Sequence, residues 1–259
     1  MLNLKYIKYE IHDDGIAFIN LNRKPVNALN INILKDLINV INDIKNNPKC
    51  RLIIFRSLQN HFCAGADLRE RKNMSKKETL LFLDKINSLF NSIENLNIPT
   101  IASINGAALG GGLELAMCCD FRVATEKAII GLTETSLGII PGAGGIRRLS
   151  NLIGISKAKY WIYTAQKFTA ENAYNDGLID FIAKEEELLG VTLEVSQEIL
   201  ENAPLAIKAS KEVLNSSFDE LDKFEKIQKE AYLKVIDTQD KQEAIKAFLE
   251  KRKPNWKNK

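Results

Sequence analysis

The sequence predicts an α/β fold in which a core of short strands and helices precedes an all-helical C-terminal region. Three observations support this prediction. Short segments typical of strands recur up to about residue 131, amphipathic helical segments separate them, and helical segments follow one another from about residue 145 to about Lys253. The first part repeats a strand–strand–helix theme, which indicates stacked turns of sheet with helices outside.

The first elements are a pair of strands and a helix. Strands are expected at 6–10 and 16–20, with Asp14-Gly15 as the turn between them. After a loop at 23–25, apolar residues recur at helical spacing over 31–44.

The following segments continue the theme. A strand at 52–56 leads through a glycine-containing loop to an amphipathic helix that spans about 80–93. The next strand, 100–104, runs into a glycine triplet that begins a helix at about Leu113. Two further strands are expected at 121–124 and 128–131.

The C-terminal part is expected to be helical. Pro204 suits the first turn of one helix. We expect residues 1–195 to form the core that carries the functional site. We expect residues 196–259 to form a helical region that covers this core or binds a second subunit.

The overall composition excludes several classes of protein. The chain has 259 residues, 45% hydrophobic and 27% charged, with a net charge of +3, so it demands neither nucleic acid nor an anionic membrane as partner. No apolar run reaches the roughly 18 residues that span a bilayer. The first ten residues lack the features of a targeting peptide, so we expect a cytoplasmic protein, or a mitochondrial matrix protein if a transit peptide has been removed.

The four cysteines and two histidines offer little for metal or nucleophile chemistry. No cysteine pair has CxxC spacing, and neither histidine sits near a second candidate ligand. We therefore expect no metal site and no Ser/Cys–His system, and we expect small buried thiols.

Two segments combine small residues with predicted helix starts, namely 62–67 and 110–114. Small residues let a ligand approach the backbone, and the first N–H groups of a helix are free to donate. Two such loops on neighbouring strands aim two N–H groups at one oxygen, which is an oxyanion hole. In the alternative interpretation, the small residues of these two segments serve only to pack the chain closely. Phosphate binding is disfavoured because neither GxGxxG nor GxxxxGK[ST] is present.

Two glutamates lie in apolar surroundings, Glu114 inside the helix after the glycine triplet and Glu134 beyond the strand that ends at Gly131. Burying a carboxylate is costly without a purpose or a partner. Two such groups make an acid/base pair that holds one water. In the alternative, one glutamate caps a helix and the other forms a salt bridge with Arg147 or Arg148.

Four motifs resemble the crotonase (enoyl-CoA hydratase/isomerase) superfamily in order and spacing: FCAGADLRE, INGAALGGGLELAMCCD, GLTETSLGIIPGAGGIRRL and the C-terminal EAIKAFLEKRKPNWK. The resemblance covers nearly the whole chain. It implies a crotonase-like spiral of ββα turns with a C-terminal helical trimerisation region, usually assembled as a trimer or a dimer of trimers. It also implies an acyl-CoA thioester substrate and no separate cofactor, since coenzyme A is part of the substrate.

The resemblance also assigns residues. It implies that Ala66 and Gly111 supply the two N–H groups of the oxyanion hole, and that Glu114 and Glu134 are the catalytic glutamates. The implied coenzyme A contacts are Lys24, Val26, Ala28, Ala64, Ala66, Asp67, Leu68, Arg69 and Gly111, with Phe248 and Lys251 added from the C-terminal helix, often of an adjacent subunit.

Because both matching positions are glutamate, the resemblance favours hydration over isomerisation or hydrolysis. The wording around AGADLRERKNMS and GLELAMCCD leans toward the methylglutaconyl-CoA hydratase branch. A different class, an RNA-binding or non-catalytic crotonase-like protein, would need lysines on one helical face. Over 31–45, Lys35 and Lys45 are instead interleaved with Asp36 and Asp43.

Overall fold

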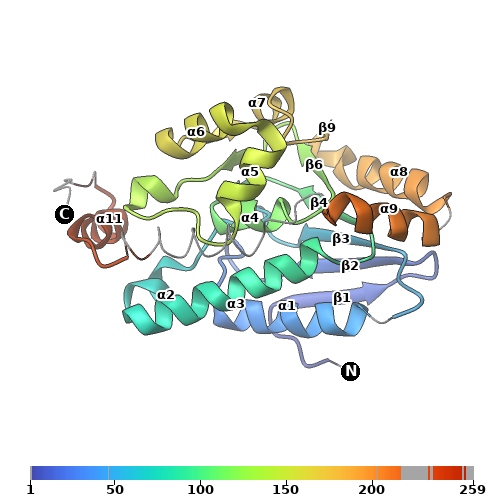
Figure 1. The fold of residues 1–259 in the computed structure, drawn as a ribbon, viewed down its shortest axis with the longest axis horizontal. Coiled ribbons are helices and arrows are strands. Elements are labelled where there is room, and N and C mark those ends of the chain that lie inside the picture. The colour runs from blue at the N-terminus through green and yellow to red at the C-terminus, as the bar shows by residue number, and fades with distance from the viewer. Residues whose placement is uncertain are drawn as a thin grey trace.

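The computed structural model describes residues 2–45, 47–202, 204–216, 233, 236–252 and 254. It contains two sheets flanked by helices (Figure 1). The six-stranded sheet has the order β1 (Ile7–Ile11), β2 (Ile16–Leu21), β3 (Leu52–Ser57), β4 (Thr100–Ile104), β6 (Phe121–Thr125) and β9 (Phe181–Ala183). The three-stranded sheet has the order β5 (Ala107–Leu109), β7 (Ile129–Gly131) and β8 (Phe168–Thr169).

Strands β1 and β2 form an antiparallel hairpin, and the remaining pairs of the larger sheet are parallel. The chain then passes from one sheet to the other within a few residues, from β4 to β5 and again from β6 to β7. In these two turns the chain therefore adds one strand to each sheet. This is the expected spiral, and the hairpin turn at Asp14-Gly15 is also as predicted.

The helices follow the strands on the outside. They are α1 (Ile31–Ile44), α2 (Leu68–Lys72), α3 (Lys76–Glu94), α4 (Gly111–Ala116), α5 (Gly145–Ile153), α6 (Ile155–Thr164), α7 (Ala170–Asn175), α8 (Leu188–Leu200), α9 (Pro204–Ser216) and α11 (Gln239–Leu249), with short 3₁₀ helices η1 (Glu134–Leu137) and η2 (Glu185–Glu187). Asn30 caps α1, and Ser75 forms a capping box with Glu78 at the start of α3.

The larger sheet is buried on both faces, as expected for parallel strands. Along β3, Ile53 and Phe55 belong to the main core with α1 and α3, whereas Leu52 and Ile54 belong to a second core that includes Val195 of α8. Figure 1 shows α1 and α3 along one side of this sheet and α8 on the other. The predicted division between residues 1–195 and 196–259 falls inside α8. This division stays a prediction.

Two differences from the sequence expectations concern very short strands. The stretch Ala107–Leu109 was not expected as a strand, and β8 and β9 lie beyond residue 145, where strands were expected largely to end. These strands have two or three residues, too few to display a periodicity of their own. They form because their backbone groups complete existing sheet edges.

All four cysteines are free and buried, as the sequence predicts. Among the residues that the structure describes, no helix is both long and apolar enough to cross a bilayer.

Candidate active site

Glu114 is held by the backbone of a loop that lies far along the chain. Helix α4 begins at Gly111, slightly earlier than predicted, and buries the Glu114 side chain with 3% exposure. The Glu114 Oε1 accepts hydrogen bonds from the N–H groups of Ala143 at 2.8 Å and Gly145 at 2.9 Å. A Cβ atom at position 145 would lie 2.7 Å from this oxygen, so only glycine allows the approach.

Glu134 is held differently. It opens η1 directly beyond β7 and is 8% exposed. Its Oε1 lies where a Cβ on Gly110 would be only 2.9 Å away. Its Oε2 is buried and has no hydrogen-bond partner within the described part of the chain. An ionised carboxylate left unsatisfied in this way would be very costly.

The two carboxyl groups flank the Gly110-Gly111 backbone and influence each other. Burial, followed by the charge of Glu114, raises the pKa of Glu134 well above its ordinary value. Burial also raises the pKa of Glu114, but the N–H groups of Gly145 and Ala143 and the charge of Arg148 oppose that rise. Of the two carboxyl groups, Glu134 therefore holds a proton more strongly, and Glu114 is the more readily ionised.

The arginines suggested as partners for these glutamates have a different partner. Arg147 and Arg148 both form ion pairs with Glu94 at the end of α3. The alternative of a salt bridge from Glu114 or Glu134 to either arginine is therefore wrong. Glu114 is satisfied instead by the N–H groups of Ala143 and Gly145.

The Ala66 N–H faces the second glycine-rich segment. Ala66 forms a parallel bridge with Leu29, in which the Leu29 N–H donates to Gly65 and the Asp67 N–H donates to Leu29. In a parallel bridge of this kind, the bridged residue's own N–H points to the opposite side. That side holds the segment around Ala108, because Cys63 bridges to it.

Gly111 presents the second N–H. It is the first residue of α4, so its N–H has no partner inside the helix. A Cβ built on Gly111 would lie 3.8 Å from the Ala66 nitrogen, and one on Gly65 would lie 3.5 Å from the Gly111 nitrogen. In the described residues neither Ala66 nor Gly111 donates a backbone hydrogen bond. Two unused donors therefore lie side by side next to the glutamates.

The remaining positions expected to contact coenzyme A fall into two groups. Residues 26–29 run beside residues 63–67, with the Ala64 N–H donating to Val26 at 3.0 Å, and α2 follows with Leu68 and Arg69 at its start. Arg23, which the sequence did not single out, joins the two segments by donating to Ala28 at 2.6 Å and pairing with Asp67. This group of residues forms one continuous strip that also includes Lys24, Ala28, Ala64, Ala66 and Asp67.

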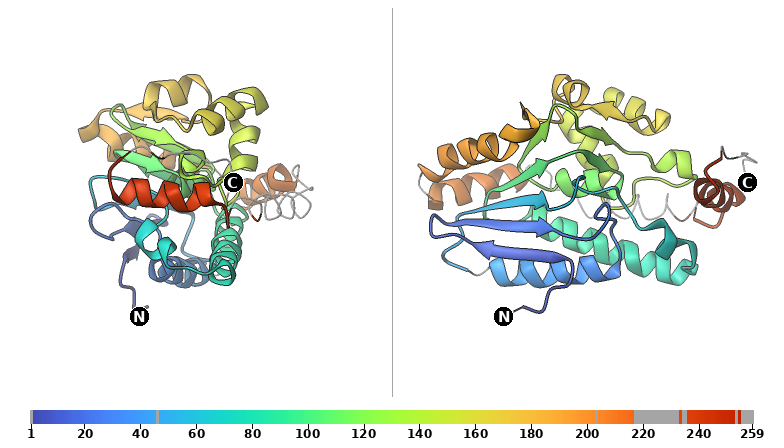
Figure 2. Two further views of the ribbon diagram at one scale, coloured as in Figure 1. Left: turned by 90° about the vertical axis from the view of Figure 1, so that its left-hand side faces the viewer. Right: turned by 180° about the vertical axis from the view of Figure 1, so that it is seen from behind.

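Phe248 and Lys251 form the second group, at the other end of the sequence. The right-hand view of Figure 2 shows α11 at the opposite end of the molecule from α8. This helix packs on η1 and buries Ala244, Ile245 and Ala247, while Phe248 stays 57% exposed. The Lys251 side chain is exposed and forms no ion pair with a described residue. The contacts of these two residues with a ligand stay a prediction.

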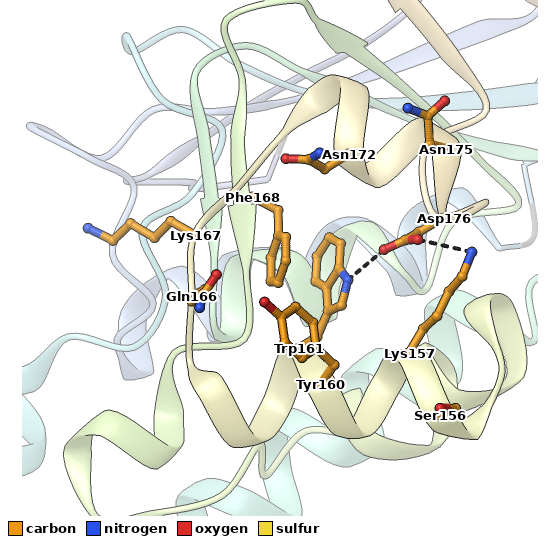
Figure 3. A pocket seen from close by; sticks show the side chains of 10 residues that line it. All are labelled: Ser156, Lys157, Tyr160, Trp161, Gln166, Lys167, Phe168, Asn172, Asn175 and Asp176. Atoms are coloured by element: carbon orange, nitrogen blue, oxygen red, sulfur yellow. Dashed lines mark hydrogen bonds and ion pairs between the residues drawn. The ribbon is translucent and has the colours of Figure 1, made fainter.

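A cavity of 520 Å³ lies away from this site, between α6 and α7 (Figure 3). Trp161 stacks on Phe168, and its Nε1 donates to Asp176, which also pairs with Lys157. These polar groups satisfy one another, and none of the predicted site residues lines the cavity. The cavity therefore has no part in the chemistry of the glutamate pair.

The glutamate pair also lacks the surroundings of a metal centre. Across the described part of the chain, no group of three or more His, Cys, Asp or Glu side chains is arranged to hold a metal ion.

The comparison with known families decides the assignment. The family model for enoyl-CoA hydratase/isomerase matches residues 12–259. The chain belongs to the enoyl-CoA hydratase/isomerase family. The probable enoyl-CoA hydratase 2 of Arabidopsis thaliana mitochondria is 44% identical over 93% of this chain and 81% of its own length. The methylglutaconyl-CoA hydratase of mouse mitochondria is 40% identical over 99% of this chain and 83% of its own length.

A solved structure agrees with this family. An enoyl-CoA hydratase from Bacillus anthracis superimposes with a TM-score of 0.81 and 38% sequence identity. The match covers 98% of this chain and 100% of that one. The resemblance drawn from the four motifs is confirmed, and so is the crotonase-like fold.

The unusual state of Glu134 gives a stability prediction. Its folded-state pKa is raised, so the folded protein holds a proton that the unfolded chain releases, and stability falls as pH rises toward that raised pKa. Glu134→Gln is therefore expected to raise the melting temperature at pH 8. Near pH 4, where both states are protonated, the difference should vanish. Thermal unfolding of wild type and variant at both pH values measures this, and an equal gain at both would show that folding does not raise the pKa of Glu134.

Proposed function

We propose that this protein hydrates 2-enoyl-CoA thioesters by syn addition of water. The observation that carries the proposal is the unequal pair of buried glutamates beside two unused N–H groups. Hydration needs one carboxylate to act on water and one carboxylic acid to give a proton. Glu114 is the more readily ionised of the two and suits the first role, whereas Glu134 holds its proton more strongly and suits the second.

In the proposed mechanism, the thioester oxygen accepts hydrogen bonds from the Ala66 and Gly111 N–H groups, which stabilise the enolate as it forms. Glu114 orients the water and accepts its proton as the oxygen bonds to Cβ. The two electrons of the double bond move to Cα, where Glu134 delivers its proton. Water is thereby added, and proton exchange between the two carboxyl groups and solvent restores the starting state.

The experiment is a spectrophotometric screen of a small enoyl-CoA panel for loss of the conjugated double bond. Crotonyl-CoA, methylglutaconyl-CoA and a 3-enoyl-CoA separate hydration from double-bond migration. Saturable loss of absorbance with a 2-enoyl-CoA supports the proposal. Turnover of the 3-enoyl-CoA alone would favour an isomerase and contradict it.

A second candidate substrate carries a carboxylate at the far end of the acyl group, as methylglutaconyl-CoA does. Arg71 of α2 is buried over the ring of Phe82, and its charge opposes the rise that burial gives to the pKa of Glu114. The charge of Arg71 near Glu114, together with the 40% identity to the mouse methylglutaconyl-CoA hydratase, favours an anionic acyl group. A higher kcat/KM for methylglutaconyl-CoA than for crotonyl-CoA would support this candidate.

RNA binding is not favoured. On α1, Asp36 is buried and accepts from the backbone N–H groups of Lys5 and Tyr6, so it is a structural residue. The exposed side of this helix carries Lys35 among asparagines and Asp43, not a row of cations. We expect no salt-dependent retention of random RNA in a binding assay.

We further propose that residues 196–259 form an assembly region and that the protein is a trimer or a dimer of trimers, which light scattering tests. The exposed Phe248 on α11 supports this proposal, because large apolar side chains at interfaces are covered by a neighbour. For its compartment we propose the cytoplasm or the mitochondrial matrix; the names of the Arabidopsis and mouse relatives describe them as mitochondrial.

Lys251 supplies a test of the coenzyme A contact. Lys251→Ala is expected to raise KM for coenzyme A esters several-fold at low salt with little change in kcat, because a lysine at the solvent edge meets a phosphate through a weak, screened contact. A short pantetheine thioester, which lacks the nucleotide phosphates, should be affected less. Equal damage with both substrates would indicate a role in the fold or the assembly.

A further inference from the structure

The loop that binds Glu114 has no regular structure of its own and is held from outside by two side chains. The Asn87 Nδ2 of α3 donates to the Gly142 carbonyl at 2.7 Å, and the Arg148 Nη1 of α5 donates to the Ala143 carbonyl at 2.7 Å. The same loop turns its Ala143 and Gly145 N–H groups toward Glu114. The Gly142–Ala143 peptide group is thus anchored at its carbonyl and binds Glu114 through its N–H, and the Ala143 carbonyl that Arg148 holds lies between the two N–H groups that bind Glu114.

Arg148 is itself fixed by helix α3. Its Nε and Nη2 donate to Glu94 at 3.2 and 2.8 Å, and Nη2 also donates to Asn91 at 2.9 Å. The side chain is 2% exposed. A planar guanidinium makes all these contacts with a fixed geometry, which an ammonium group cannot do.

We propose that Arg148, through its ion pair with the half-buried Glu94, positions the proposed catalytic Glu114 by holding the 143–145 loop. The inference rests on the proposed function, in which Glu114 acts as the ionised carboxylate. Arg148 and Glu94 are positioning residues, because they touch neither substrate nor reacting atoms. They act on Glu114 indirectly. Arg148 holds the Ala143 carbonyl, and the N–H groups of Ala143 and Gly145 bind the Glu114 carboxyl.

The adjacent arginine is a matched control. Arg147 is also buried and pairs with the same oxygen of Glu94, but within the described residues it donates no hydrogen bond to the 141–145 loop. Arg147→Lys therefore alters a contact of the same Glu94 carboxylate and leaves the Arg148 contact with the Ala143 carbonyl in place. Arg148→Lys keeps the positive charge but removes the planar guanidinium, whose Nη1 holds this carbonyl.

The expected result differs between the two variants. Arg148→Lys should lower kcat by about 10- to 100-fold, the scale expected when a catalytic group is slightly misplaced, with KM little changed. The acid limb of its pH–rate profile should move to higher pH, because Glu114 loses N–H donors that favour its ionised form. Arg147→Lys should leave both kcat and the acid limb close to wild type, whatever its melting temperature.

A titration of the Glu114 carboxyl carbon by NMR gives the same information without turnover. The Glu114 pKa should rise in Arg148→Lys and stay unchanged in Arg147→Lys. If Arg148→Lys does not fold, Asn91→Ala serves as a second variant. It removes the Asn91 oxygen that accepts from Arg148 Nη2, and it should raise the Glu114 pKa by a smaller amount.

The inference is overturned if Arg148→Lys keeps the wild-type profile and carboxyl titration, or if both lysine variants change them equally. A wild-type enzyme that hydrates no member of the panel would contradict the proposed function. In that case the NMR titration would still decide the role of Arg148.

Discussion

Glu134→Gln is expected to lower kcat for hydration of a 2-enoyl-CoA by at least ~10², the contribution of a positioned general acid. Gln matches the shape of a protonated glutamate but has no proton to deliver to Cα. The buried Glu134 Oε2 has no hydrogen-bond partner among the described residues, so the substitution breaks no interaction there. Loss of activity with a melting temperature equal to or above that of wild type would separate chemistry from folding.

Glu114→Gln should have a similar effect on kcat for a complementary reason. The amide oxygen of Gln can still accept from Ala143 and Gly145, so the loop stays in place, but the group can no longer take a proton from water. The double variant should be scarcely worse than either single one, since both groups act on one water. Near-normal turnover in Glu134→Gln would point to a one-glutamate chemistry.

Ala66→Pro is expected to lower kcat by about 10²- to 10³-fold, because proline has no N–H and an oxyanion-hole donor is worth about 2.7 to 4 kcal/mol. The Ala66 N–H makes no backbone hydrogen bond in the described structure, so the fold loses none. The preceding residue is Gly65, with φ of 95°, and glycine tolerates the restriction that a following proline imposes.

The control for this variant is Ala66→Ser, which keeps the N–H and should retain most of the activity. Circular dichroism checks that both variants fold. A folded Ala66→Pro enzyme with normal kcat would show that Ala66 is not a donor.

The longer elements could be predicted from the sequence because each carries its own periodicity. The helix at 31–44 and the strand at 100–104 have the predicted limits, since their apolar spacing and flanking residues specify them locally. Strands β5 and β9 could not be predicted, because three residues form a strand only when a neighbouring edge is already present.

The same distinction applies to the site. Glu114 and Glu134 were found because a carboxylate in an apolar segment is visible in the sequence. Glu94 and Arg23 were missed, because each looks like an ordinary surface charge. Their roles depend on partners brought close only by the fold, Arg148 for the first and Asp67 for the second.

The contact between η1 and α11 has a consequence for the order in which the protein is made. Glu134 opens η1, and Gly138 at its end lies so close to α11 that a Cβ there would be 2.8 Å from the Lys241 Cα. A ribosome releases Glu134 long before it releases residues 239–249, and N-terminal segments fold first during synthesis. The nascent chain can therefore build both sheets while η1 is still uncovered on this side. The surroundings of the proposed acid are completed only when the last helix docks, so activity should appear late in synthesis, after most of the fold has formed.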